Sequence, residues 1–218
     1  VSFAGAATRL LVLARTGDAE EAIDLFLVDP KAAGVAISQR QNLGSETTFR
    51  VDLDGVRVAV SDRVGAPGSG WATWHAVMLD GIVLAAAQAA GGASAALEMT
   101  VDYAKTREQF GKPLGAFQAI SHYLADGATA IEGGRNVVYE AAWSRSVGKD
   151  VSALAPMAKL FMCGAFRDLT ATCQQVWGGV GFTIEYDIQL YFRRAKQLQM
   201  SWYDERALSE LVARQVLA

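Results

Sequence analysis

The stretch that decides the fold spans residues 103–118 and reads YAKTREQFGKPLGAFQ. A glycine and a proline, Gly111 and Pro113, mark a turn in its middle. Residues 71–103 before the turn are rich in alanine and lack proline, and residues 117–146 after it repeat apolar side chains at helical spacing. The stretch therefore predicts a tight connection between two long helices.

Three further helical segments follow this connection. Residues 151–177 repeat the helical pattern, with Pro156 near the start of the segment, where the missing N–H costs nothing. Two shorter helices are expected at 187–197 and 205–218. Long helices joined by short loops favour an up-and-down, four-helix-type bundle. The Ala- and Gly-rich part of the first helix, with Gly91 and Gly92, predicts tight packing or a subunit contact.

The chain before residue 64 has a different period. Short β-rich runs at 10–14, 25–28, 35–37, 49–53 and 56–60 alternate with turn signals, among them Gly44-Ser45. Asp54-Gly55 lies between the last two runs and predicts a hairpin. A Gly/Pro-rich segment at 64–70 marks the boundary. The fold class is thus α+β and mostly α: a short antiparallel β segment (1–64) followed by a helical bundle (71–218).

Composition excludes several classes of protein. The 218 residues carry a net charge of −3 without a run of Lys or Arg, which argues against a nucleic-acid partner. The longest apolar run, 82–90, is interrupted by Gln88 and is far shorter than the roughly 20 residues of a membrane span. We expect no secretory signal, because no positively charged start followed by an apolar core appears at Val1. Cys163 and Cys173 are expected to be buried free thiols, and the predicted location is cytoplasmic.

No hydrolytic or metal-binding motif is visible. The chain lacks a G-x-S-x-G elbow, and its histidines, His75 and His122, have no ligand spacing, so we expect no metal site. A glycine cluster, Gly178-Gly179-Val180-Gly181, ends the third long helix. It is either a helix stop or a place where the backbone meets a ligand's phosphate or sugar.

Residues of the first stretch also allow two interpretations each. Arg107 could cap the helix end as a cation or bind a phosphate bidentately. Phe110 could belong to the core or support an adenine ring. Gln118 could be solvated or contact a ribose or an amide.

The order and spacing of these residues favour the binding interpretations. Y-A-K-x-R-x-Q-F-G-x-P-x-x-x-F-Q followed by Q-x-x-G-G-x-G-F-T closely resembles the acyl-CoA dehydrogenase family. LLVLART, LFLVD and GVRV resemble the end of that family's central β domain, and YDIQLYFRRAK resembles the segment after its glycine motif. The resemblance covers essentially the whole chain.

The resemblance implies an FAD-dependent oxidoreductase that desaturates an acyl-CoA, with hydride passing to flavin N5. It also implies a homo-oligomer, a dimer or tetramer, because the FAD sites of this family are shared between subunits. An electron-transfer flavoprotein is a possible partner. The residues that match the family's FAD contacts are Arg107, Phe110, Gln118, Gln175, Gly178 and Gly179.

The resemblance does not supply the catalytic base. Most members carry a Glu in the loop before the last helix, where this chain has Trp202; Asp204 and Glu205 follow two and three residues later. Other members hold the base on the first long helix, at the position of Gly81, with Asp80 beside it. Asp204, Glu205 and Asp80 are therefore the candidate bases.

The family's N-terminal helical domain and early strands are missing from this sequence. An alternative to a complete enzyme is a non-catalytic subunit that completes the FAD site of a paralogous chain. A third possibility is a helical bundle that has lost FAD.

Overall fold

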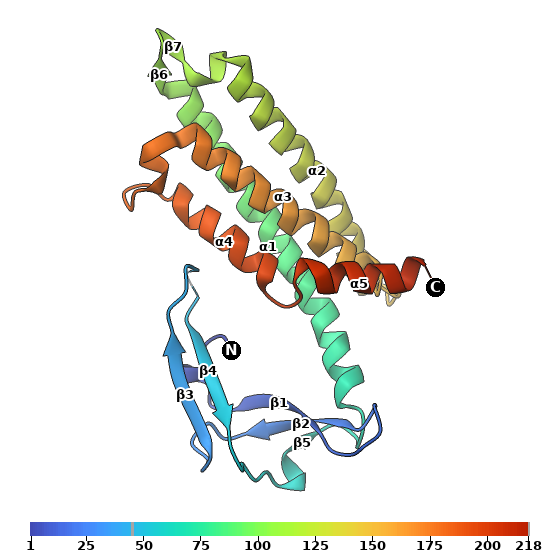
Figure 1. Cartoon of the computed structure of the whole chain (residues 1–218). Helices are drawn as coiled ribbons and strands as arrows, with labels where there is room; N and C mark the ends of the chain where they lie inside the picture. Colours follow the sequence, from blue (N-terminus) through green and yellow to red (C-terminus); the bar gives the residue numbers. More distant parts are fainter. Residues whose placement is uncertain (45, 218) are drawn as a thin grey trace. The chain divides into compact units, whose positions relative to one another are not determined.

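The structure is a computed structural model that describes residues 1–44 and 46–217. It divides into two compact units, Val1–Met78 and Leu79–Ala218, so that the boundary falls inside the first long helix. The α+β class and the predominance of helix are confirmed (Figure 1).

The first unit contains two small antiparallel sheets rather than one. β1 (Leu10–Arg15), β2 (Ile23–Val28) and β5 (Arg63–Val64) form one sheet, with β2 in the middle. β3 (Val35–Arg40) and β4 (Thr48–Leu53) form the other. Ala4, Leu10 and Val28 make a small buried core between them. The predicted turn at Gly44-Ser45 includes Ser45, which lies outside the described residues.

The predicted strand at 56–60 and its Asp54-Gly55 hairpin are wrong. Residues 56–59 form no strand, and Val60–Asp62 is a 3₁₀ turn. Asp54 instead closes the end of the β3–β4 ladder, because its N–H donates to Gly34 O at 2.9 Å. Val56 then packs against the small core rather than extending a strand. The β-rich run at 56–60 therefore reflects the burial of Val56 in this core and not a strand.

The second unit is a helical bundle. α1 (Gly70–Thr106) enters it from the first unit, and α2 (Gln118–Ser146), α3 (Leu154–Trp177) and α4 (Ile188–Met200) follow up and down. α5 (Glu205–Val216) is the last helix; the last residue of the predicted segment, Ala218, lies outside the described residues. The predicted helices all exist, with ends displaced by up to three residues.

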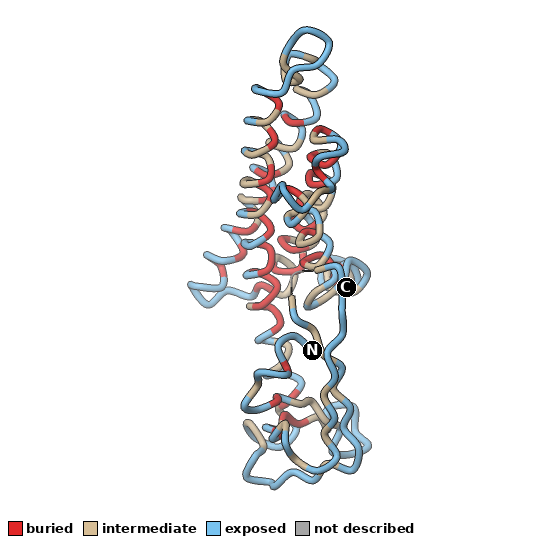
Figure 2. Tube along the Cα trace, turned by 90° about the vertical axis from the view of Figure 1, so that its left-hand side faces the viewer, coloured by how far each residue is buried: buried red, intermediate tan, exposed pale blue. Residues whose placement is uncertain are grey.

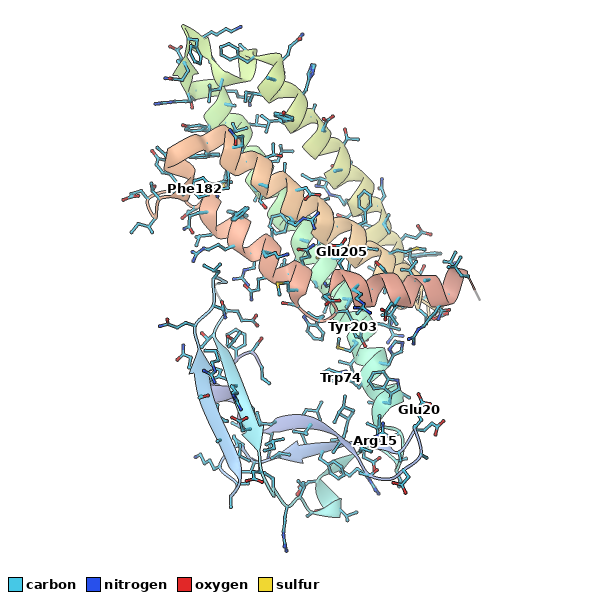
Figure 3. The ribbon with its side chains drawn as sticks, viewed as in Figure 1. Arg15, Glu20, Trp74, Phe182, Tyr203 and Glu205 are labelled. Carbon is cyan, nitrogen blue, oxygen red and sulfur yellow. The ribbon has the colours of Figure 1, made fainter. Side chains whose placement is uncertain are left out.

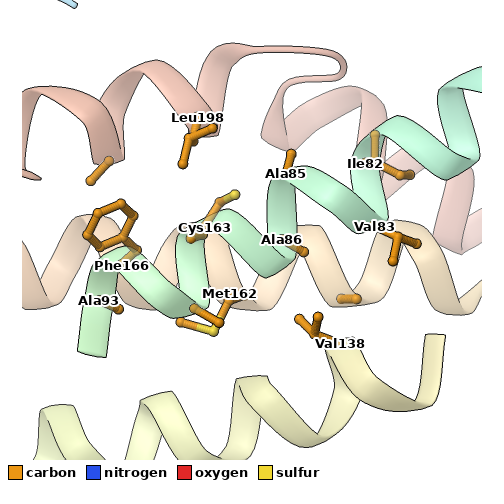
Figure 4. Packing of buried hydrophobic residues seen from close by; sticks show 14 of the residues in the cluster. Ile82, Val83, Ala85, Ala86, Ala93, Val138, Met162, Cys163, Phe166 and Leu198 are labelled. Carbon is orange, nitrogen blue, oxygen red and sulfur yellow. The ribbon is translucent and has the colours of Figure 1, made fainter. Parts of the chain in front are cut away.

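α3 packs against α2, α4 and α5, and together with α1 it supplies most of the buried core. Buried positions recur along it at helical spacing, and Figure 2 shows such positions concentrated in the bundle. Alanines of α1 allow close approach: Figure 4 shows Ala86 and Ala93 among the larger Met162 and Phe166 of α3. A Cβ on Gly92 would come within 2.7 Å of the Phe166 ring, so this glycine is required by tight packing.

Neighbouring Gly91 behaves differently, since a Cβ there would meet nothing within 4 Å. Both cysteines are free and buried, as expected. By length and composition α1 could cross a membrane, but 56% of its most apolar window is buried inside the protein. That burial is typical of the core helix of a bundle.

Candidate functional site

The first motif folds into a two-residue hairpin between α1 and α2. β6 (Glu108–Gln109) pairs with β7 (Lys112–Pro113), and Gln109 lies opposite Lys112. Phe110 and Gly111 form the turn with φ of 54° and 78°, the left-handed pair that a type I′ turn requires. Phe110 is therefore held at the tip and is 92% exposed, with its ring edge-to-face with the Phe117 ring. It is not a core residue.

Arg107 directly precedes this hairpin, and Gln118 follows it after a 3₁₀ turn, Leu114–Ala116. The N–H of Arg107 donates to Tyr103 O at 2.8 Å, which continues α1 by one bond. Its side chain is exposed and makes no hydrogen bond or ion pair with any described residue, including the helix-end carbonyls. The Gln118 side chain is also exposed and unpaired among the described residues.

Gln118 opens α2, whose first turn has no side-chain cap from Phe117 and no acidic residue. Free backbone N–H groups at a helix start favour a negative ligand group, and a guanidinium can bind a phosphate bidentately. This corner of the bundle thus offers a free cation, a free amide and an exposed aromatic ring.

An open pocket of about 450 Å³ adjoins the same corner. Its volume lies within the range of small-ligand pockets. Its walls are mostly apolar and come from α1, β7, the 3₁₀ turn at 114–116 and α2: Val101, Ala104, Lys105, Pro113, Gly115, Ala116, Ser121 and Leu124.

The second motif forms a 3₁₀ turn, Gly178–Phe182, directly after α3. Gly178 stops the helix with φ 64° and ψ −144°, a conformation open essentially to glycine alone, and its N–H donates to Gln174 O. A Cβ on Gly178 or Gly179 would meet nothing within 4 Å. The glycines therefore end the helix and also leave exposed backbone that a ligand could approach.

An aromatic stack joins the ends of α1 and α3. The Tyr103 and Trp177 rings lie 4.1 Å apart at 10°, and Trp177 Nε1 donates to Thr100 Oγ1 at 3.2 Å. Tyr186, after the glycine turn, packs against the edge of Trp177. Both motifs consequently lie towards the same end of the bundle (Figure 1). Gln175 is exposed beside the glycine turn and unpaired among the described residues.

The two positions expected for a base meet in space. The indole of Trp202 lies on α1 at Gly81, so closely that a Cβ on Gly81 would overlap the ring. Trp202 has φ 68°, left-handed for a large residue, directly after α4. The indole therefore occupies the space beside α1 where a side chain at Gly81 would project.

The three candidate carboxylates have structural partners. Asp80 forms a two-bonded ion pair with Arg145, which raises the pKa of that guanidinium. Asp204 caps α5 by accepting the Ala207 N–H at 2.9 Å. Glu205 accepts from Gln199 Nε2 at 3.0 Å and lies 3.5 Å from an Arg167 nitrogen.

Lys159, which the sequence analysis did not select, holds the turn between α4 and α5. Its buried ammonium donates to Tyr203 O at 2.8 Å and to Gln199 O at 3.3 Å. Burial lowers the pKa of Lys159 and raises that of the Tyr203 phenol. Figure 3 shows Tyr203 and Glu205 at this turn. The sequence does contain a signal for this role, because Lys159 stands at a buried position in the helical pattern of α3.

No group of three or more His, Cys, Asp or Glu side chains that could hold a metal lies together in residues 1–44 and 46–217. The donors available are instead unpaired amides, one guanidinium and open glycine backbone.

Comparison with known proteins supports the family resemblance of the chain as a whole. Residues 68–203 match the family model described as acyl-CoA dehydrogenase, C-terminal domain. An acyl-CoA dehydrogenase of Bacillus subtilis is 36% identical over 182 residues, covering 82% of this chain and 48% of the relative. A subunit of the caffeyl-CoA reductase–Etf complex of Acetobacterium woodii is 32% identical over 174 residues, covering 78% and 46%.

The fold agrees with that relationship. The structure of butyryl-CoA dehydrogenase from Megasphaera elsdenii superposes with a TM-score of 0.92 at 31% identity, covering 98% of this chain and 57% of the other. The chain thus spans about half the length of the curated relatives it matches. With a family-model match over most of its length and a shared fold, this chain belongs to the acyl-CoA dehydrogenase family, a family of FAD-binding flavin oxidoreductases, and corresponds to its C-terminal portion.

Proposed function

We propose that this chain is the flavin-binding C-terminal portion of an FAD-dependent acyl-CoA dehydrogenase that desaturates a CoA thioester in the cytoplasm. Residues 1–64 would be the end of its central β domain and residues 71–218 its bundle for FAD binding and oligomerisation. The observation that carries the proposal is the set of unpaired binding groups towards one end of the bundle.

These groups fit FAD chemically. The free guanidinium of Arg107 suits a pyrophosphate, and the exposed ring of Phe110 suits the face of an adenine. The amides of Gln118 and Gln175 can bond to ribose or ring atoms. Gly178 and Gly179 present backbone without side chains. Groups exposed without partners in the chain itself are what a shared cofactor site requires.

The chemistry that FAD supplies in this family is acceptance of the hydride from the β carbon of the thioester. The chain's own residues bind and orient the cofactor. Removal of the α proton needs a carboxylate of suitable geometry. Asp204, Glu205 and Asp80 stay the candidates for that role, and each would first have to leave its present partner.

A homo-oligomer follows from the same proposal. Leu84 of α1 and Tyr139 and Trp143 of α2 are 70%, 65% and 54% exposed. Beside them runs an open groove of about 470 Å³ that includes Gly91 and Tyr139. Large exposed apolar side chains next to a small-residue groove favour a helix-to-helix subunit contact. A second copy would bring a second set of FAD-binding groups.

A second candidate function is that of a non-catalytic subunit that completes the FAD site of a paralogous chain. The packing of Trp202 on Gly81 favours it, because an indole fills the place of the expected carboxylate. In either role an electron-transfer flavoprotein is the proposed electron acceptor, in line with the name of the Acetobacterium woodii relative.

A spectrum and a reduction test distinguish these functions. The protein is purified, its flavin absorbance is recorded, and a panel of acyl-CoA thioesters is added without oxygen. Bound FAD that is bleached by one thioester supports the dehydrogenase. Bound FAD that no thioester bleaches in the homo-oligomer, but that is bleached after co-expression with a paralogous chain, supports the partner subunit. A colourless protein that binds no added FAD would refute both.

A further inference from the structure

Gln174, one residue before the predicted cofactor contact Gln175, is buried without a partner. Its residue is 3% exposed, and both Nε2 and Oε1 lack a hydrogen-bond partner among the described residues. Gln199, the other buried glutamine, differs: its side chain is bonded to Lys196 and Glu205. Buried amides are nearly always bonded in folded proteins, so an unpaired one calls for an explanation.

The amide of Gln174 lies beneath the glycine turn. A Cβ on Gly181 would come within 2.7 Å of Gln174 Oε1 and 2.8 Å of the Trp177 Cβ. Gly181 is therefore a glycine because the Gln174 amide fills the space below it. Gly178 and Gly179, by contrast, have open space where their side chains would be. The turn thus has a closed inner side at Gly181 and an open outer side at Gly178 and Gly179.

We propose that Gln174 is a positioning residue for the glycine turn, whose backbone bonds to the Gln174 amide when a phosphate-bearing dinucleotide sits on Gly178 and Gly179. Gln174 does not touch the ligand in this arrangement. An unpaired buried amide lowers the stability of the ligand-free protein, and the hydrogen bonds that the amide gains on binding increase the affinity for the ligand. The inference rests on the proposed FAD-binding function and adds a residue that the sequence motif does not contain.

The test compares Gln174→Met with Gln199→Met in the full chain. Methionine keeps the length and flexibility of glutamine without its polar atoms. For Gln174→Met we expect a melting temperature that is unchanged or raised by about 2–4 °C without FAD. We expect its FAD dissociation constant to rise roughly tenfold, the equivalent of one lost hydrogen bond. Gln199→Met breaks bonds that already exist, so it should lower the melting temperature and leave FAD affinity unchanged.

Hydrogen exchange provides a readout independent of affinity. FAD should slow exchange of the 178–182 amides in the wild-type protein and slow it much less in Gln174→Met. Equal FAD affinity and equal protection in the two proteins would overturn the role of Gln174 while leaving the FAD-binding function intact. So would a lower melting temperature in Gln174→Met with unchanged affinity, the result expected if a buried water pairs the amide. Wild-type protein that binds no FAD would overturn the proposed function and this inference with it.

Discussion

The indole of Trp202 covers Gly81, and these two residues occupy the two positions at which relatives are expected to carry a base. They lie 121 residues apart in the sequence (202 − 81) but form one contact. Each residue by itself shows only that the expected carboxylate is absent at its position. Together they form a packed unit, in which the missing side chain of one makes room for the ring of the other.

Gly81→Ala should lower the free energy of unfolding by roughly 1–3 kcal/mol, because the added methyl collides with Trp202. Urea unfolding measures the change. Gly164→Ala, inside α3, is the control, since its Cβ meets nothing within 4 Å; it should stabilise by about 0.5–1 kcal/mol. If both alanines stabilised equally, the indole would not rest on Gly81.

Lys159→Met should destabilise the protein by about 1–3 kcal/mol near neutral pH, because the carbonyls of Gln199 and Tyr203 lose their donor. Urea unfolding of the two proteins measures this difference. The exposed Lys105→Met provides a control for removing a lysine.

The effect of Lys159→Met should also depend on pH. Burial lowers the pKa of Lys159 from its usual 10.5, so the unfolded chain binds the proton more tightly than the folded one. The stability of the wild type relative to the variant should therefore rise with pH in the window below 10.5 and level off above it. A difference that stayed flat across this window would contradict the buried ammonium.

Asp204→Ala should cost about 0.5–2 kcal/mol through loss of the α5 cap, whereas Asp204→Asn should cost only a few tenths, because an amide oxygen can still accept the Ala207 N–H. Thermal unfolding gives both values. Flavin reduction by acyl-CoA is measured on the same variants. Loss of reduction in both, with stability kept in Asp204→Asn, would identify Asp204 as the base rather than only a cap.

Asp80→Asn should change stability by less than about 1 kcal/mol, because its ion pair with Arg145 is nearly half exposed. A double-mutant cycle with Arg145→Gln isolates the pair. A coupling well above that value would show that the pair is more buried in the assembled protein than in a single chain.

Phe110→Gly should stabilise the free chain by about 0.5–1 kcal/mol, since glycine adopts φ 54° without strain and the ring is exposed. The same change should weaken FAD binding and subunit association, which titration calorimetry and sedimentation measure. Phe110→Asn, which also tolerates a left-handed backbone, separates the loss of the ring from the change in backbone. Unchanged affinity in both variants would remove Phe110 from the site.

The sequence by itself determined the helices, most of the strands and the family. Period and turn residues predicted the helices, and the spacing within 103–118 and 175–182 predicted the two motifs, because these patterns are local and each residue's neighbours in sequence set them. The hairpin predicted at Asp54-Gly55 does not form, because Val56 packs into a small core. That core exists only once the strands have assembled.

Only the tertiary structure decided which residues meet. Packing brings together residues that are distant in the sequence: Tyr103 stacks on Trp177, and the indole of Trp202 lies on Gly81. Packing also buries Lys159 under the α4–α5 turn and leaves the Gln174 amide unpaired beneath Gly181. In the sequence, Gln174 and Lys159 are only polar residues on an apolar helix face. Their roles depend on carbonyls and glycines that other segments bring to them, and no local pattern specifies that arrangement.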